Sequence, residues 1–113
     1  MISKLNRFHG YNSLNGVYRK GKAVRGEYIS LRYTNSKRED YRLAVVVSRK
    51  VSKSAVVRNR IRRRIFEIVR LHRKELNKPW PQDLVISVFE EKAATIPAEE
   101  LKTTVLKMLQ KVG

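Results

Sequence analysis

The segment from Arg49 to Arg64 has the residue types needed to bind phosphate. Eight of its sixteen residues are lysine or arginine, and no acidic residue occurs between Asp40 and Glu67. Arginine predominates in its second half, and a guanidinium can grip a phosphate with two N–H groups and stack on a base. Asn59 offers both a donor and an acceptor to a base edge or a ribose hydroxyl. The segment therefore predicts binding of nucleic acid.

The charge of the whole chain points the same way. Its 113 residues include 26 Lys and Arg against 10 Asp and Glu, a net charge of +16. Residues 1–74 hold 21 basic and four acidic side chains, whereas residues 75–113 hold five basic and six acidic ones. A charge of this size repels itself in a compact domain, and a polyanionic partner relieves the repulsion and releases counterions.

A solvated basic helix face is the simpler alternative interpretation of the arginine run. Against it, like charges at i,i+4 spacing destabilise a helix unless something neutralises them. In addition, Arg58 and Arg62 fall close to the apolar side of the helix expected over residues 55–76. We therefore expect the first turns of this helix to project past the core toward a partner, where the helix N-terminus would also attract phosphate.

The sequence offers little for catalysis or metal binding. Cysteine is absent, which excludes disulfides and thiolate metal sites and is consistent with a reducing compartment. His72 lies on an apolar helical stripe and is interpreted as structural, and the paired acids at 90–91 and 99–100 lack metal-site spacing. We expect no catalytic residue, no metal site and no cofactor bound by the chain.

The sequence also lacks signals for a membrane. No apolar run reaches membrane-spanning length, and residues 1–10 lack the apolar core of a signal peptide. We expect a cytoplasmic protein with no membrane partner.

Hydrophobic periodicity predicts the elements that must position the basic segment. A short helix is expected from residue 12 or 13 to about 20, ended by Gly21, then strands over 28–33 and 43–47. A basic loop, 48–54, leads into the long helix over 55–76, which Asn77 and Pro79 end. A strand over 84–89 and a helix from about Pro97 follow, and residues 23–27 could add a short strand.

This order, α-β-β-α-β-α, predicts one domain over residues 1–113. One sheet with helices packed on it, an α/β two-layer sandwich of the α+β class, is the natural arrangement. In the strand over 28–33, alternation puts Tyr28 and Arg32 on the face opposite Ile29 and Leu31.

Three segments resemble one known family. Val56-Val57-Arg58-Asn59-Arg60-Ile61-Arg62-Arg63 closely resembles the signature of the bacterial ribonuclease P protein, roughly V-x-R-N-R-I-K/R-R-x-x-R-E. The stretch 46–51 is similar to that family's strand ending in S-K-K/R-V, and 7–21 resembles its opening segment. The resemblance covers essentially the whole chain.

The resemblance implies both a fold and a function. The fold would be like the second domain of ribosomal protein S5, with a left-handed βαβ crossover where general rules predict a right-handed one. The chain would be the auxiliary, non-catalytic protein subunit of the endoribonuclease. Its partners would be the ribonuclease P RNA, which requires magnesium, and the 5′ leader of precursor tRNA, whose removal the protein promotes over a broadened substrate range.

The family's two binding surfaces can be carried over onto this sequence. The residues that match the surface for the catalytic RNA are Arg49, Lys50, Lys53, Arg58, Asn59, Arg60, Arg62 and Arg63. The residues that match the leader cleft are Leu14, Tyr18, Tyr28 and Arg32. The chain departs from the family pattern at Leu14 and Leu31, where aromatics are common, at Gly26, where arginine is frequent, and at Arg64 and Phe66.

Two other functions remain open at this level. A ribosomal or other structural RNA-binding protein would show the same charge without a role toward a substrate. A DNA-binding module could place the helix over 58–64 in a major groove, although the family resemblance predicts no DNA partner.

Overall fold

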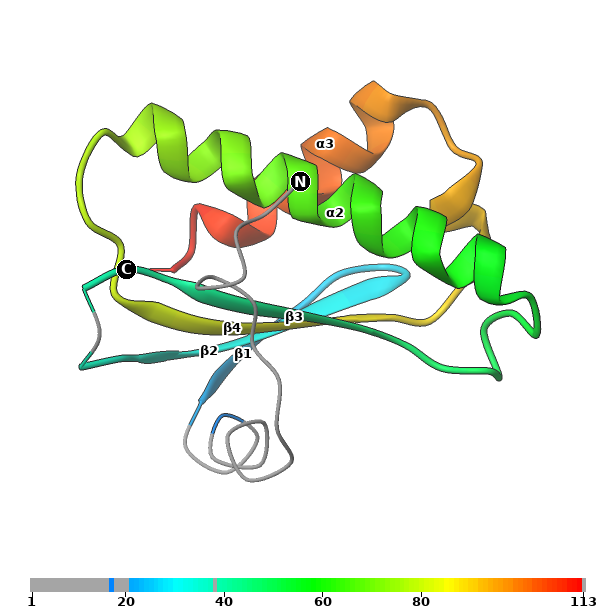
Figure 1. Cartoon of the computed structure of the whole chain (residues 1–113), viewed down its shortest axis with the longest axis horizontal. Coiled ribbons are helices and arrows are strands. Elements are labelled where there is room, and N and C mark those ends of the chain that lie inside the picture. The colour runs from blue at the N-terminus through cyan, green and yellow to red at the C-terminus, as the bar shows by residue number, and fades with distance from the viewer. Residues whose placement is uncertain (1–16, 18–20, 38, 113) are drawn as a thin grey trace.

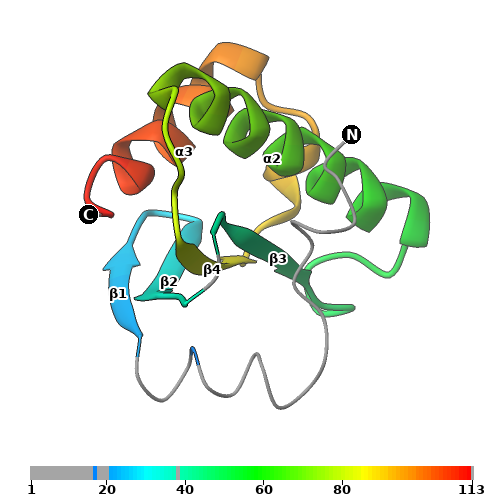
Figure 2. The same ribbon diagram turned by 60° about the vertical axis from the view of Figure 1, so that its left-hand side comes forward.

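The computed structural model describes residues 17, 21–37 and 39–112. Its elements are β1 (Lys22–Arg25), β2 (Ile29–Asn35), β3 (Arg42–Val47), α2 (Ala55–Leu76), β4 (Gln82–Val88), the 3₁₀ helix η2 (Glu91–Ala94) and α3 (Ala98–Leu109). The four strands form one sheet in the order β1-β2-β4-β3. Helices α2 and α3 lie on the same face of it, as Figures 1 and 2 show. This is the two-layer α+β arrangement that the sequence predicts.

The link from β3 through α2 to β4 joins two neighbouring parallel strands. Val47 at the end of β3 is paired with Val88 at the end of β4. When the sheet is viewed with the helices in front of it and with β3 and β4 both running upward, β4 lies to the left of β3 (Figures 1 and 2). The crossover is therefore left-handed, as the family resemblance implies and against the general rule.

The long helix α2 spans the residues predicted for it. Ser54 caps its start by accepting a hydrogen bond from the Val57 N–H at 3.3 Å. Asn77 ends it in the left-handed conformation, with φ 51°. Ile61, Ile65 and Val69 are fully buried, so α2 packs on the sheet through one narrow stripe.

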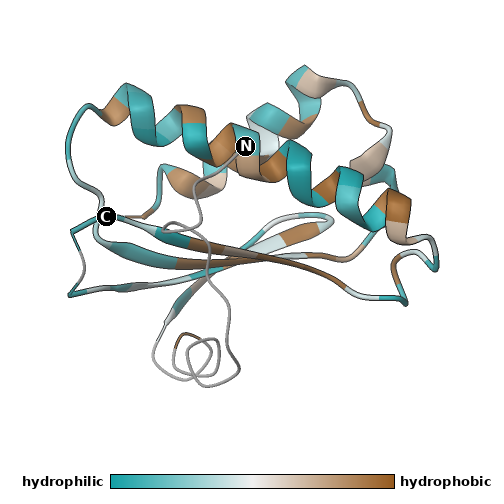
Figure 3. Cartoon of the chain, viewed as in Figure 1, coloured by the Kyte–Doolittle hydropathy of each residue, from teal (hydrophilic) through white to brown (hydrophobic). Residues whose placement is uncertain are grey.

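Different groups of side chains pack on the two faces of the sheet. The helix side carries the main core, formed in the sheet by Ile29, Leu31, Leu43, Val45, Leu84 and Ile86. On the opposite face, Val17 packs on Ala44 and Val85 near β3. The middle of β3 and β4 is accordingly hydrophobic, whereas α2 alternates between hydrophobic and hydrophilic stretches (Figure 3).

Gly21 follows the segment predicted as the first helix. Of that segment only Val17 lies within the described residues, and it is helical. The Gly21 N–H donates to the Val17 carbonyl at 2.7 Å, and a Cβ at Gly21 would stand 2.9 Å from the Tyr33 carbonyl oxygen. A larger residue would not fit, which agrees with Gly21 as the terminator.

Trp80 anchors the turn that follows α2. Its buried indole lies 5.8 Å from the Tyr41 ring and 5.3 Å from the His72 ring, measured between centroids. Burial lowers the pKa of His72, which favours the neutral imidazole. His72 is therefore a packing residue, as its place on the apolar stripe predicts.

The optional strand predicted around residues 23–27 is confirmed as β1, at residues 22–25. Two details refine the sequence prediction. The 3₁₀ helix η2 was not predicted, because four residues carry no periodic signal. Pro97 caps α3 rather than starting it. Within the described part of the chain, no helix is both long and apolar enough to cross a membrane.

The packing of α2 makes a direct stability prediction. Ile65→Ala removes a side chain with no exposed surface and should lower the free energy of unfolding by about 2–5 kcal/mol. Leu71→Ala, on the same helix but 41% exposed, is the matched control and should cost much less. Urea unfolding of both variants measures the difference, and equal losses would contradict the packing described for α2.

Candidate nucleic-acid interface

The loop between β3 and α2 is held by its own serines. The Val51 N–H donates to the Ser48 carbonyl at 3.1 Å, which turns the chain at the end of β3. The buried Ser52 accepts a hydrogen bond from the Ser54 N–H at 3.2 Å, and Ser54 caps α2. These hydrogen bonds fix the backbone of the loop and so the positions from which its basic side chains extend.

Most of the predicted RNA-binding side chains point outward from this loop and from the first turns of α2. The exposed ones are Arg49, Lys50, Lys53, Asn59, Arg60 and Arg63, and the half-buried ones are Arg58 and Arg62. We call these eight residues the arginine surface. The first turn of α2 contains no acidic residue, so the positive end of the helix dipole adds to their charge.

Arg58 and Arg62 differ from the expectation that the first turns project past the core. The Arg58 guanidinium donates to the Ser52 carbonyl at 2.9 Å. Arg62 donates to Asn59 Oδ1 at 2.9 Å and to the Val47 carbonyl at 3.4 Å. Both side chains therefore lie close to the apolar side because they tie α2 to the loop and to the end of β3. Asn59 acts partly as a positioning residue for Arg62.

The acids that form the described ion pairs have partners outside the arginine surface. The described ion pairs join Arg42 to Asp83, Arg70 to Glu67, Arg73 to Asp40, and Lys92 to Glu27. Among the described residues, none of these pairs involves a member of the arginine surface. The arginines are thus gathered on one open cationic surface rather than neutralised by carboxylates of the same chain.

Arg64 follows the arginine surface in sequence but faces the interior. Its guanidinium donates to the carbonyls of Ala93 and Ile96, at 2.8 and 2.5 Å. These bonds hold the end of η2 against α2. Phe66, half-buried, packs on the main core. The two departures from the family pattern at 64 and 66 thus have structural roles in this chain.

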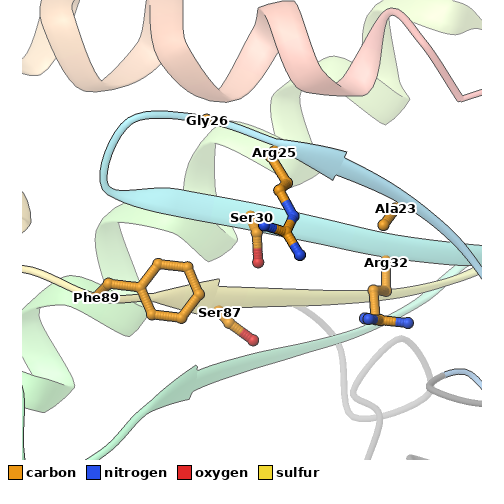
Figure 4. A pocket seen from close by; sticks show the side chains of 7 residues that line it. All are labelled: Ala23, Arg25, Gly26, Ser30, Arg32, Ser87 and Phe89. Carbon is orange, nitrogen blue, oxygen red and sulfur yellow. The ribbon is translucent and has the colours of Figure 1, made fainter.

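A second candidate surface is a groove of about 430 Å³ on the sheet face away from the helices. We call it the sheet groove. Its lining residues are Ala23, Arg25, Gly26, Ser30, Arg32, Ser87 and Phe89. Figure 4 shows the side chains of Arg25, Arg32 and Phe89 above this face of β1, β2 and β4. Cationic, hydroxyl and aromatic groups together suit a single-stranded nucleic acid.

Of the two predicted leader-binding residues that the structure describes, Arg32 lines the sheet groove and Tyr28 does not. Leu14 and Tyr18 lie outside the described residues. Tyr28 was expected to share the face of Arg32, and this expectation of its orientation is wrong. It lies between the turn at Gly26 and β2, and its side chain is 3% exposed and part of the main core. Its hydroxyl donates to Thr104 Oγ1 at 3.3 Å, and Lys92 Nζ lies 4.6 Å from the ring centroid.

Two further departures from the family pattern have local causes. Leu31 is fully buried on the helix side of β2, so its side chain faces away from the sheet groove. Gly26 turns the chain between β1 and β2, where its N–H donates to the Ile29 carbonyl at 2.8 Å. A Cβ at Gly26 would stand 2.8 Å from that carbonyl oxygen, so the turn favours glycine here.

Sequence reasoning missed Arg25, Ser30, Ser87 and Phe89 as members of the groove. The signal that could have found them is strand register. Arg25 pairs with Ser30, and Ser30 pairs with Ser87, so the three share one face. Phe89 follows two residues after Ser87, and period-two alternation puts it on that face as well.

The described residues hold no cluster of three or more histidine, aspartate or glutamate side chains that could bind a metal ion. Neither surface contains a nucleophile paired with a base. What the arrangement can do chemically is bind a polyanion on one surface and a flexible strand on the other.

Comparison with known proteins decides the family. The model of the family described as Ribonuclease P matches residues 2–113. The chain belongs to the ribonuclease P protein family. This confirms the resemblance that the R-N-R-I-R-R segment carries.

Relatives and solved structures agree with this membership. The ribonuclease P protein component of Thermus brockianus is 40% identical over 95 residues, which cover 84% of this chain and 53% of that protein. The one from Desulfosudis oleivorans is 30% identical, covering 84% and 75%. This chain spans about half the length of its Thermus relatives.

The RNase P proteins of Staphylococcus aureus and Thermotoga maritima share its fold. Each superposes with a TM-score of 0.81, at 24% and 22% sequence identity. The match covers 95% of this chain in both cases, with 96% and 97% of the respective structures.

The two roles found for neighbouring arginines predict different effects of mutation. Arg64→Ala should lower the free energy of unfolding by about 1–3 kcal/mol, because it leaves two carbonyls without their charged donor. Arg63→Ala, at an exposed position one residue earlier, should change it by no more than about 0.5 kcal/mol. Thermal or urea unfolding measures both changes. If Arg64→Ala did not lower the free energy of unfolding, Arg64 would not be holding η2 against α2.

Proposed function

We propose that this chain is the auxiliary protein subunit of a ribonuclease P. It binds the catalytic RNA through the arginine surface and the 5′ leader of precursor tRNA through the sheet groove, and so promotes removal of the leader and broadens the substrate range. The observation that carries the proposal is the cationic surface around the start of α2, which stands apart from the chain's described ion pairs.

The arginine surface suits a folded RNA on physical grounds. Its cations come from a loop and a helix start that are held together by Arg58 and Arg62, so they are organised before the partner arrives. Each phosphate they neutralise releases counterions, which makes binding strong and dependent on salt. Duplex DNA could meet the same charge, but the family membership favours RNA.

The two surfaces meet at one end of the sheet. The basic loop leaves β3 after Val47, and Phe89 of the groove leaves β4 after Val88, its pairing partner. Both strand ends lie at the right of Figure 1. A strand of RNA held on the arginine surface can therefore pass into the sheet groove without crossing the core.

Cleavage is assigned to the RNA partner. The described residues lack a carboxylate cluster for the magnesium ions of phosphodiester hydrolysis, so we place those ions on the RNA. The protein then contributes binding and positioning only. The proposal also places the protein in the cytoplasm, where bacterial precursor tRNA is made.

Rescue of an RNA-only reaction tests the function. The protein, added to a bacterial ribonuclease P RNA and precursor tRNA at low magnesium, should restore cleavage at the mature 5′ end. The variant Arg60→Ala/Arg63→Ala should rescue less, whereas Lys102→Ala/Lys107→Ala, equally reduced in charge but on α3, should rescue fully. No rescue by the unmodified protein would favour a structural RNA-binding role instead.

Salt dependence tests the contacts of the arginine surface. Arg60→Ala and Arg63→Ala each remove one exposed cation and should reduce the slope of log affinity against log salt by up to about one unit. Titration of labelled ribonuclease P RNA at several salt concentrations measures the slope, with Lys102→Ala as the control. Unchanged slopes would mean that these two side chains do not lie on phosphates.

A further inference from the structure

Phe89 stands out among the aromatic residues that the structure describes. Its side chain is 60% exposed, whereas the rings of Tyr28, Tyr41 and Trp80 are buried and those of Tyr33 and Phe66 are partly buried. A phenyl ring that stays in contact with water contributes little hydrophobic stabilisation to the fold. A single exposed apolar residue is common on protein surfaces, so its surroundings must decide whether it has a role.

The surroundings of Phe89 are those of a nucleotide site. The ring lies at one end of the sheet groove, with Arg25 and the hydroxyls of Ser30 and Ser87 beside it (Figure 4). The groove, at about 430 Å³, falls within the size range of small-ligand sites. An aromatic face for a base, a guanidinium for a phosphate and hydroxyls for a ribose or base edge are the groups that hold single-stranded RNA.

The backbone of Phe89 is fixed even though its ring is exposed. Its N–H donates to the Tyr28 carbonyl at 2.9 Å, which extends the pairing of β2 with β4 by one residue. Tyr28 in turn is buried and bonded to Thr104 on α3. The ring is thus presented from a rigid part of the sheet, so little freedom is lost when a base stacks on it.

The position of Phe89 along the RNA path is equally specific. It lies where β3 and β4 end together, next to the loop that starts the arginine surface. A strand entering the sheet groove from that surface meets Phe89 first and Arg32 further along β2, since Arg32 pairs with Val85, four residues before Phe89.

We propose that Phe89 is the stacking platform for one nucleobase of the 5′ leader, and that it gives this protein a preference for a purine at that leader position. The inference rests on the proposed function. Purines stack more strongly than pyrimidines because their rings are larger, whereas Phe89 has no polar atom with which to choose between adenine and guanine.

An abasic scan of the leader tests the platform. Precursor tRNAs carrying one abasic nucleotide at successive leader positions are bound to the holoenzyme with unmodified protein or with Phe89→Ala. One position should lose about 5-fold to 30-fold in affinity with the unmodified protein and much less with Phe89→Ala. The same position, filled in turn with adenine and uracil, should favour adenine only when an aromatic ring is present.

Two conservative variants separate stacking from general packing. Phe89→Trp should keep or strengthen the purine preference, and Phe89→Leu, which retains apolar bulk, should abolish it. Leu71→Ala, an exposed apolar residue on the far half of α2, is the matched control and should leave the scan unchanged. Binding of mature tRNA, which has no leader, should be the same for all of these proteins.

The outcomes distinguish this inference from the function on which it rests. If the leader contributes affinity at some position but Phe89→Ala and the unmodified protein give the same scan, Phe89 is not the platform and the function stands. If the protein gives no advantage to leader-bearing substrate at all, the sheet groove is not a leader site and the proposed function fails with it.

Discussion

The parallel pairing of β3 with β4 is the constraint on which the rest of this structure depends. Parallel neighbours end at the same edge of the sheet, so the loop after Val47 and the residue after Val88 come together. The crossover helix must then start at that edge and return over the sheet. This places the amino end of α2, with its positive dipole, beside both strand ends. One pairing thus brings the arginine surface and the sheet groove to the same place.

The two ends of β3 and β4 differ in how their charges are paired. The ion pairs of Asp83 with Arg42 and of Asp40 with Arg73 lie where β3 and β4 begin and α2 ends. Burial by itself would raise the pKa of Asp40, but hydrogen bonds from Arg73 and from the Tyr41 and Trp80 N–H groups, together with the charge of Arg73, lower it and keep this carboxylate charged. Acids and bases are paired at that end. At the other end Glu27 pairs with Lys92, but none of the described ion pairs involves the arginine surface, so its cations are left for a partner. The self-repulsion there is tolerated because Ile61 and Ile65 anchor α2 in the core.

Arginine performs two distinct tasks within one short stretch of α2. Arg60 and Arg63 are exposed, whereas Arg58, Arg62 and Arg64 donate to carbonyls of the loop, of β3 and of the segment around η2. The donors of one group organise the surface that the other group presents. A guanidinium suits both tasks, because its planar set of N–H groups binds carbonyls and phosphates alike.

The sequence by itself determined the long helix, the three main strands and the basic segment, because periodicity and charge are local properties. It also carried the family, through the R-N-R-I-R-R segment. Only the tertiary structure decided which arginines face solvent, since the wheel position of Arg64 does not reveal the carbonyls of Ala93 and Ile96. For the same reason, Tyr28 is buried although it was expected to share the face of Arg32, and Phe89 is exposed. Burial depends on which distant segments pack together, and here α3 covers Tyr28 while the open sheet face leaves Phe89 exposed.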